Sequence, residues 1–253
     1  MPDLFLLFTA AFFAGLLDAM VGGGGLIQVP ALFSILPNTA AATLFGTNKV
    51  AGIFGTGVAA AGYARRVKVQ WNAAAPAAMA AFICAFIGAY VVTKVPSDFL
   101  RKLLPLILLS VLVYTWRRKD LGQIHAPLHG GFGEQWLAVL VGAGIGFYDG
   151  FFGPGTGSFL VFLFVRVFGF DFLGASAASK IVNVACNCAA LLWFGYSGHV
   201  LWQLGVSMAA FNILGSLVGT RLAVRHGSSL IRRVFLFVVL ALILKTAYDG
   251  FIR

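Results

Sequence analysis

The sequence is poor in charged residues, and this scarcity decides its broad class. Only 10% of its 253 residues are Asp, Glu, Lys or Arg, whereas 60% are hydrophobic and the mean hydropathy is +0.94. A soluble domain carries about 25% charged residues. The composition therefore excludes a soluble domain and predicts an all-α integral membrane protein. The 18 cations outnumber the 8 acids but lie in short clusters between apolar segments, which suits anionic lipid headgroups rather than nucleic acid.

Cysteine and histidine are also scarce. Each of the three cysteines falls in an apolar segment, where packing as a small hydrophobic side chain is the expected role. His125 and His129 are four residues apart, but Pro127 between them favours a loop over a metal-binding helix face. No Ser/His/Asp or paired-carboxylate constellation is present. We therefore expect no catalytic residue, no metal and no cofactor.

Apolar segments alternate with short polar turns along the first half of the chain. They predict helices over residues 4–21, 26–36, 41–62, 70–93 and 99–116. Segment 41–62 corresponds to roughly 33 Å at 1.5 Å per residue, enough to cross the hydrocarbon core. The first residues lack the cationic region of a cleavable signal peptide, so we expect the first helix to remain in the protein.

Two glycine-rich stretches interrupt these segments, and each follows an aspartate. Asp18 precedes Gly22–Gly25, and Asp149 precedes a loop that contains Pro154 and four glycines. Glycine and proline release backbone groups from the helical ladder, which at membrane depth is tolerated only beside protein or a watery cavity. Paired broken helices of this kind indicate the binding site of a secondary transporter.

The two halves of the chain repeat one another at an offset of 131 residues. Asp18 corresponds to Asp149, Lys49 to Lys180 and Trp71 to Trp202. We therefore divide the chain into a first transmembrane repeat at 1–120, a linker at 121–133 and a second repeat at 134–253. Each repeat has a glycine-broken helix hairpin and three spanning helices, about 8–10 membrane segments in all.

The orientation of the repeats depends on whether the broken segment crosses the membrane or turns back. Crossing makes the halves parallel, whereas a hairpin makes them inverted. The inverted arrangement leaves fewer cations outside, since it keeps Arg225, Arg232 and Arg233 in the cytoplasm with clusters 65–68 and 117–119. We therefore favour an inverted repeat with both termini outside.

The paired motifs resemble the sulfite exporter TauE/SafE family, also called the toluene sulfonate uptake permeases. The residues that carry this resemblance are GLLDAMVGGGGLIQVP, LFGTNKVAG, GFYDGFFGPGTGSFLVF and AASKIVN. The resemblance covers nearly the whole chain. It implies a multi-pass carrier of the bacterial inner membrane for sulfite, thiosulfate, sulfoacetate or another organosulfonate.

An anion site can also be argued from the residues themselves. A helix that restarts after a glycine loop presents unpaired N–H groups and about half a positive charge. We expect both restarting helices to face one central substrate, through Gly24 and Gly25 in the first half. In the second half the donors are Gly155, Thr156, Gly157 and Ser158. The alternative is that these glycines only permit close helix packing.

Lysines and asparagines within the spans are further candidates. Lys49 and Lys180 occupy matched positions, and a cation at the bilayer centre costs roughly 2.5–3.5 kcal/mol. They either attract the substrate anion, or snorkel or pair with Asp18 and Asp149. In the first case we expect Lys180→Ala, and to a lesser degree Lys49→Ala, to abolish binding. The accompanying polar residues are Asn48, Ser179, Asn183 and Asn187.

The two aspartates admit two roles. Asp18 and Asp149 either support the loops by capping and pairing, or carry a coupling proton. Among function classes, a secondary carrier of a small anion is favoured over an anion channel, because duplicated broken helices provide two gates about one site. No residue set supports an enzyme. The direction of transport, the coupling ion and the oligomeric state stay open.

Overall fold

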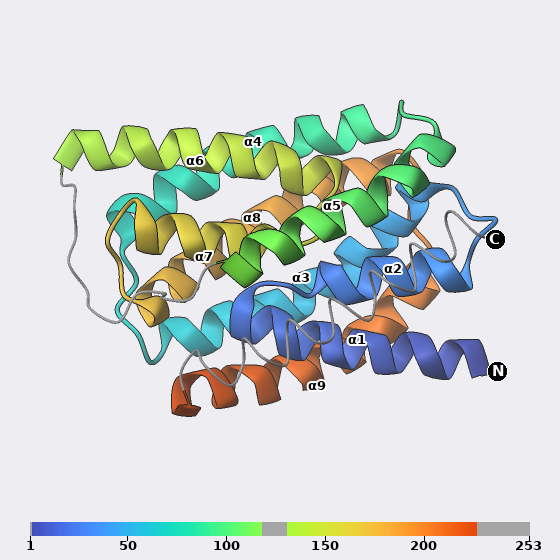
Figure 1. The fold of residues 1–253 in the computed structure, drawn as a ribbon, viewed down its shortest axis with the longest axis horizontal. Coiled ribbons are helices and arrows are strands. Elements are labelled where there is room, and N and C mark those ends of the chain that lie inside the picture. The colour runs from blue at the N-terminus through green and yellow to red at the C-terminus, as the bar shows by residue number, and fades with distance from the viewer. Residues whose placement is uncertain (1, 118–130, 227–253) are drawn as a thin grey trace.

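The computed structural model describes residues 2–117 and 131–226, and all the regular structure in these ranges is helical. Figure 1 shows the helices running mainly along the long axis of the molecule. The helices of the first half are α1 (Pro2–Val21), α2 (Gly25–Ile35), α3 (Ala41–Ala64), α4 (Trp71–Val92) and α5 (Ser97–Arg117). Those of the second half are α6 (Gly131–Phe151), α7 (Thr156–Arg166), α8 (Phe172–Tyr196) and α9 (Trp202–His226).

The helices predicted from the apolar segments are confirmed, including the break after each aspartate. The first segment ends at Val21, and the chain restarts as α2 at Gly25. The second break separates Phe151 from Thr156. Residues 118–130, which hold most of the predicted linker with His125 and His129, lie outside the described residues, as does the last predicted span after residue 226.

The helices recur at the offset found in the sequence. The first residues of α2 and α7 are 156 − 25 = 131 positions apart, those of α3 and α8 are 172 − 41 = 131 apart, and those of α4 and α9 are 202 − 71 = 131 apart. Each half therefore contains a long helix, a short helix that begins after a glycine loop, and two further long helices.

Helices of one half pack against helices of the other in a reciprocal way. A Cβ atom on Gly15 would lie 2.0 Å from the Asn212 carbonyl oxygen, so α1 and α9 approach closely. A Cβ atom on Gly146 would lie 2.5 Å from the Ala81 Cα, so α6 and α4 do the same. Since 146 − 15 and 212 − 81 are both 131, the two contacts are equivalent. Reciprocal contacts of this kind indicate a pseudo-two-fold axis between the halves.

The relation between α3 and α8 shows how the halves are oriented. These equivalent helices lie against each other, with Gly46 beside Phe194 and Gly52 beside Asn187. One residue number rises as the other falls, so the helices are antiparallel, and Figure 1 shows α3 and α8 running in opposite directions. This geometry supports the inverted-repeat interpretation. The location of the termini outside the cell stays a prediction.

Small residues make the close packing between the halves possible. Ala77, Ala81 and Ala85 form a buried stripe on α4, and Gly142 and Gly146 of α6 lie against it. Gly142 and Gly146 therefore serve the packing of α6 against α4. Close approach of backbones over small side chains is the usual basis of helix association in membranes.

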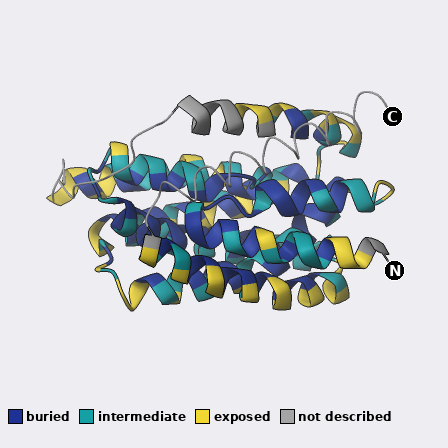
Figure 2. Ribbon diagram, turned by 60° about the horizontal axis from the view of Figure 1, so that its bottom comes forward, coloured by how far each residue is buried: buried dark blue, intermediate teal, exposed yellow. Residues whose placement is uncertain are grey.

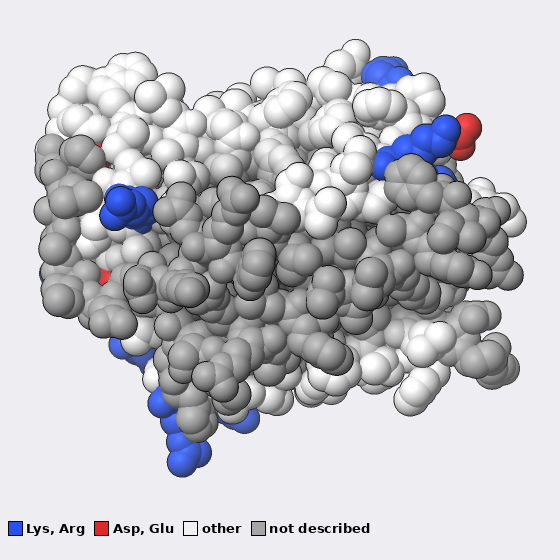
Figure 3. All heavy atoms as spheres, viewed as in Figure 1, with Lys and Arg blue, Asp and Glu red and all other residues white. Residues whose placement is uncertain are grey.

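The described surface exposes many large apolar side chains. Figure 2 shows exposed residues on the outward faces of the bundle around a buried interior. On α4, Met79, Ile83 and Ile87 are exposed at a spacing of four. Where described atoms are visible in Figure 3, Lys and Arg lie toward the left and right ends of the long axis. Four helices among the described residues, α1, α4, α8 and α9, are long and apolar enough to cross a membrane.

Candidate functional site

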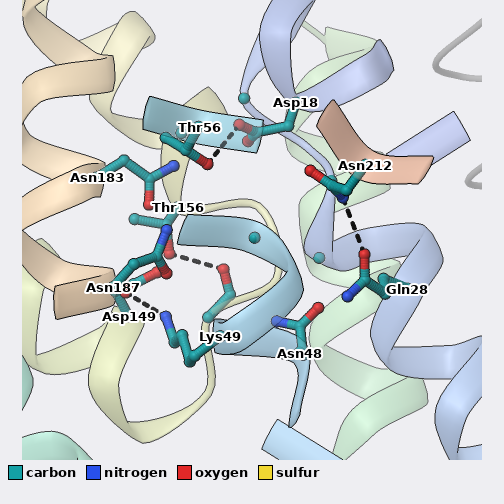
Figure 4. A pocket seen from close by; sticks show the side chains of 16 residues that line it. Asp18, Gln28, Asn48, Lys49, Thr56, Asp149, Thr156, Asn183, Asn187 and Asn212 are labelled. Atoms are coloured by element: carbon teal, nitrogen blue, oxygen red, sulfur yellow. Dashed lines mark hydrogen bonds and ion pairs between the residues drawn. The ribbon is translucent and has the colours of Figure 1, made fainter. Parts of the chain in front are cut away.

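A small polar cavity of about 40 Å³ lies where the two glycine loops meet α3, α8 and α9 (Figure 4). Ten of the residues predicted for the site or for its support line it, and they come from both halves. These are Asp18, Gly24, Gly25, Asn48, Lys49, Asp149, Thr156, Gly157, Asn183 and Asn187. The other four, Gly155, Ser158, Ser179 and Lys180, are not among the lining residues.

Two buried ion pairs join the halves across this site. Lys49 of α3 pairs with Asp149 of α6, and both side chains line the cavity. Lys180 of α8 pairs with Asp18 of α1, at 3.1 Å between Nζ and Oδ2. The pairs are equivalent, since 180 − 49 and 149 − 18 are both 131. The structure therefore places each lysine beside the aspartate of the other half, the pairing that the sequence left open.

The two pairs differ in their surroundings. Lys180 is 1% exposed, and its ammonium group also donates to the Asp18 carbonyl oxygen. Thr56 donates to Asp18 Oδ2 at 2.9 Å. Lys49 instead reaches the cavity wall, beside Gly153. Each ammonium charge is balanced by a carboxylate, so the four side chains together carry no net charge.

The glycine loops are in direct contact with each other. Gly22 and Gly153 hold equivalent positions and have positive φ angles of 82° and 93°, which glycine adopts readily. The Ser158 amide donates to the Gly22 carbonyl at 3.1 Å, and the Ser158 hydroxyl donates to the Val21 carbonyl at 2.9 Å. The break in the first half is thus fixed to the first turn of α7 in the second.

Two backbone amides beside the cavity, one from each half, have no acceptor among the described residues. Among the described residues, the N–H groups of Gly25 and Gly157 have no hydrogen-bond acceptor. Both glycines line the cavity and lie in the first two residues of α2 and α7, where the helix itself supplies no acceptor. Two helix N-termini thus offer donors and partial positive charge at one place, which favours an anion.

The hydroxyl groups expected to bind the anion already donate to the protein. Thr156 donates to the Gly153 carbonyl at 2.7 Å, and Ser179 donates to the Gly157 carbonyl at 3.1 Å. Since a hydroxyl has one proton to donate, these side chains and Ser158 support the loop in this conformation. That these hydroxyls bind substrate stays a prediction.

Three further polar residues line the cavity that the sequence pattern did not indicate. They are Gln28, Thr56 and Asn212. Thr56 could have been found from the repeat, because it is the counterpart of the predicted site residue Asn187, 187 − 56 being 131. Gln28 and Asn212 correspond to Phe159 and Ala81, so the repeat gave no signal for them.

Comparison with known proteins gives consistent results over almost the full length. The family model described as Sulfite exporter TauE/SafE matches residues 7–246. The probable membrane transporter protein ORF9 of Sinorhizobium sp is 37% identical over 243 residues, 96% of this chain and 92% of that protein. The probable membrane transporter protein YfcA of Escherichia coli strain K12 is 33% identical over 244 residues, 96% of this chain and 89% of that protein.

A probable membrane transporter protein of Haemophilus influenzae is 31% identical over 246 residues, 97% of this chain and 95% of that protein. No solved structure matches the chain.

Proposed function

The chain belongs to the sulfite exporter TauE/SafE family of multi-pass bacterial inner-membrane transporters, and we propose that it is a secondary transporter of small sulfur-containing anions. The observation that carries the proposal is the cavity between the halves, where unpaired amides of both broken helices converge. The lining supplies hydrogen-bond donors without a net positive charge. Such a site binds an anion without holding it too tightly for release.

The arrangement of the halves supports alternating access. The cavity lies at the meeting point of two pseudo-symmetric halves, and the ion pairs and loop contacts all join one half to the other. Rocking of one half against the other would break one set of contacts and keep its equivalent. A channel is the alternative, and saturation and counterflow of sulfite in proteoliposomes distinguish a carrier from it.

The size of the cavity favours the smallest of the candidate anions. One water needs about 10–15 Å³ of such space, so 40 Å³ holds about three waters. Sulfite, with one sulfur and three oxygens, is of comparable size. A longer organosulfonate would need a wider conformation. We therefore place sulfite and thiosulfate ahead of sulfoacetate.

A coupling proton is the second part of the proposal. Asp149 lines the cavity and neutralises Lys49. A proton taken up by this carboxylate would leave the ammonium group unbalanced beside the substrate, so proton and anion would bind together. Flux of sulfite driven by an imposed pH gradient in proteoliposomes tests this coupling, and flux insensitive to the gradient contradicts it.

Binding to the purified protein tests the substrate class. Thermal shift and calorimetry would compare sulfite, thiosulfate and sulfoacetate with sulfate, phosphate and acetate. We expect saturable binding of the sulfur anions, sulfite and thiosulfate most tightly, and at least tenfold weaker binding of acetate. Equal affinity for all six anions, or binding of none, contradicts the proposed function.

Gly52→Ala is expected to weaken sulfite binding without loss of stability. Gly52 lines the cavity from α3, and an added Cβ would meet only the Asn187 Nδ2 atom, at 3.9 Å. The methyl group therefore takes up space in the cavity without a backbone clash. Alanine in place of glycine favours a helix interior by about 0.8–1.0 kcal/mol. We expect an affinity loss of at least fivefold, measured by calorimetry, with a melting temperature that is unchanged or higher.

Gly57→Ala is the matched control. Gly57 lies five residues further along the same helix, and an added Cβ atom there would have nothing within 4 Å, so the variant tests helix propensity alone. Its affinity for sulfite should stay within twofold of the wild type. Equal affinities in the two variants would contradict the location of the anion in this cavity.

A further inference from the structure

We propose that Gln28 is a substrate-binding residue, which donates a hydrogen bond from its side-chain amide to an oxygen atom of the transported anion. The inference rests on the proposed function and adds to it a residue that the repeat and the glycine loops did not indicate. Gln28 lies in α2, three residues after the Gly25 amide, and both residues line the cavity.

The first observation is an unsatisfied donor. Gln28 is 1% exposed, and within the described ranges its Nε2 atom has no hydrogen-bond partner. A buried amide donor left without an acceptor costs free energy, because it has lost its bonds to water. Such an atom beside a polar cavity is therefore suited to receive an oxygen of a ligand.

The second observation is that the direction of the Gln28 amide is set by its neighbours. Asn212 Nδ2 donates to the Ala11 carbonyl at 3.2 Å and to Gln28 Oε1 at 3.1 Å. Because a backbone carbonyl only accepts, the Asn212 atom facing it must be the nitrogen. The second proton on Asn212 Nδ2 then needs an acceptor, so the Gln28 atom that faces Asn212 must be the oxygen Oε1. The Gln28 nitrogen Nε2 therefore points away from Asn212. Figure 4 shows this nitrogen turned away from Asn212.

Asn212, which orients Gln28, is itself enclosed by neighbouring helices. Asn212 is 3% exposed and lies at the contact between α1 and α9. A Cβ atom on Gly55 would lie 1.8 Å from Asn212 Oδ1, so α3 closes the remaining side. Three helices thus hold Asn212, and Asn212 holds Gln28. A donor held in place before the ligand arrives loses little freedom on binding.

The donor also makes the site asymmetric. The equivalent residue in α7 is Phe159, since 159 − 28 = 131, and Phe159 packs on Tyr148 with ring centroids 5.6 Å apart. Only the first half therefore offers a side-chain amide at this position. A donor of this kind recognises an oxygen and has no acceptor for a hydroxyl proton. The ligand class is an oxyanion whose oxygen points at α2.

Gln28→Glu tests the proposal most directly. A glutamate keeps an oxygen to accept from Asn212, but it replaces the free donor with a second oxygen, which repels the oxyanion. We expect the affinity for sulfite, measured by calorimetry on the purified full-length protein, to fall at least 30-fold. Gln28→Met, which removes the amide altogether, should lower the affinity at least fivefold. The substitution removes the unsatisfied Nε2 donor but also the oxygen that accepts from Asn212. Because the gain and the loss offset each other, the anion-free melting temperature should fall by no more than 2 °C.

Phe159→Leu is the matched control in the other half, and it should keep the affinity within twofold. Sulfite affinities of both Gln28 variants within twofold of the wild type overturn the inference while leaving the proposed function intact. A fall in anion-free stability with unchanged affinity also overturns it, since Gln28 would then only support Asn212. Failure of the wild type to bind any sulfur anion overturns the proposed function, and this inference with it.

Discussion

Replacing Lys180 by methionine is expected to lower the free energy of unfolding by about 3–5 kcal/mol, because removal of one partner leaves a buried charge uncompensated. Lys180 is 1% exposed and Asp18 is 7% exposed, so water can do little to stabilise the Asp18 carboxylate once the ammonium group is gone. Among the described residues, the Asp18 carboxylate would keep only the hydrogen bond from Thr56, at 2.9 Å. Thermal unfolding in detergent should show a large fall in the melting temperature.

The double variant Lys180→Met with Asp18→Asn separates charge from packing. Asparagine still offers an oxygen to Thr56, and neither buried side chain is then charged. Neutral replacements of a buried ion pair are often tolerated, so most of the lost stability should return. The same pair of variants at Lys49 and Asp149 gives the matched comparison, because the two ion pairs are equivalent in the repeat.

The two double variants should differ in anion binding. Lys49 and Asp149 both line the cavity, whereas Lys180 does not. We therefore expect the variant lacking charges at Lys49 and Asp149 to lose sulfite affinity at least tenfold, and the other to lose less. This order is the reverse of the one we expected from the sequence, where Lys180 was given the larger role. Equal and unimpaired transport by both double variants would show that the pairs only hold the halves together.

The sequence predicted the helices and their repeat because both follow from local features. Long apolar segments bounded by charge clusters give helices, and the glycine runs end α1 and α6. The matched lysines and aspartates were also visible, and the sequence included their pairing as one of two possibilities. It could not decide that pairing, because an offset between halves does not show which helices touch.

Some cavity-lining side chains were not predicted, again because the sequence does not show which helices touch. Asn212 reaches the cavity because α9 packs against α1 and α3 of the opposite half, which no local pattern indicates. Gln28 appeared as one polar residue in a short apolar helix. The hydroxyls of Thr156 and Ser158 were expected to face a ligand, but nearby carbonyls released at the helix breaks compete for their protons. This competition depends on the loop conformation, which the sequence does not determine because glycine allows many backbone conformations.

Gly22→Ala is expected to be among the most damaging single-methyl changes in the chain. An alanine there must adopt a φ angle near 82°, and its Cβ would lie 2.2 Å from the Gly157 carbonyl carbon. The left-handed conformation costs about 1–2 kcal/mol, and overpacking adds typically 1–3 kcal/mol. The backbone must also move, and this movement lengthens or breaks the 3.1 Å hydrogen bond from the Ser158 amide to the Gly22 carbonyl. We expect a loss of about 2–5 kcal/mol in stability, together with loss of sulfite uptake.

Gly198→Ala isolates the conformational part of this effect. Gly198 follows α8, has a φ angle of 75°, and has nothing within 4 Å of the added methyl group. The Gly198→Ala variant should therefore lose only about 1–2 kcal/mol in the free energy of unfolding and keep sulfite uptake. Gly153→Ala has the equivalent φ angle of 93° with a milder backbone contact than Gly22→Ala, since the nearest atom to its Cβ is the Asp149 carbonyl oxygen at 3.2 Å. Its loss of stability should therefore lie between those of the other two variants. Melting temperatures and proteoliposome uptake would be measured for all three variants. If Gly22→Ala proves no more harmful than Gly198→Ala, the direct contact between the two glycine loops is wrong, because that contact is what distinguishes the two positions.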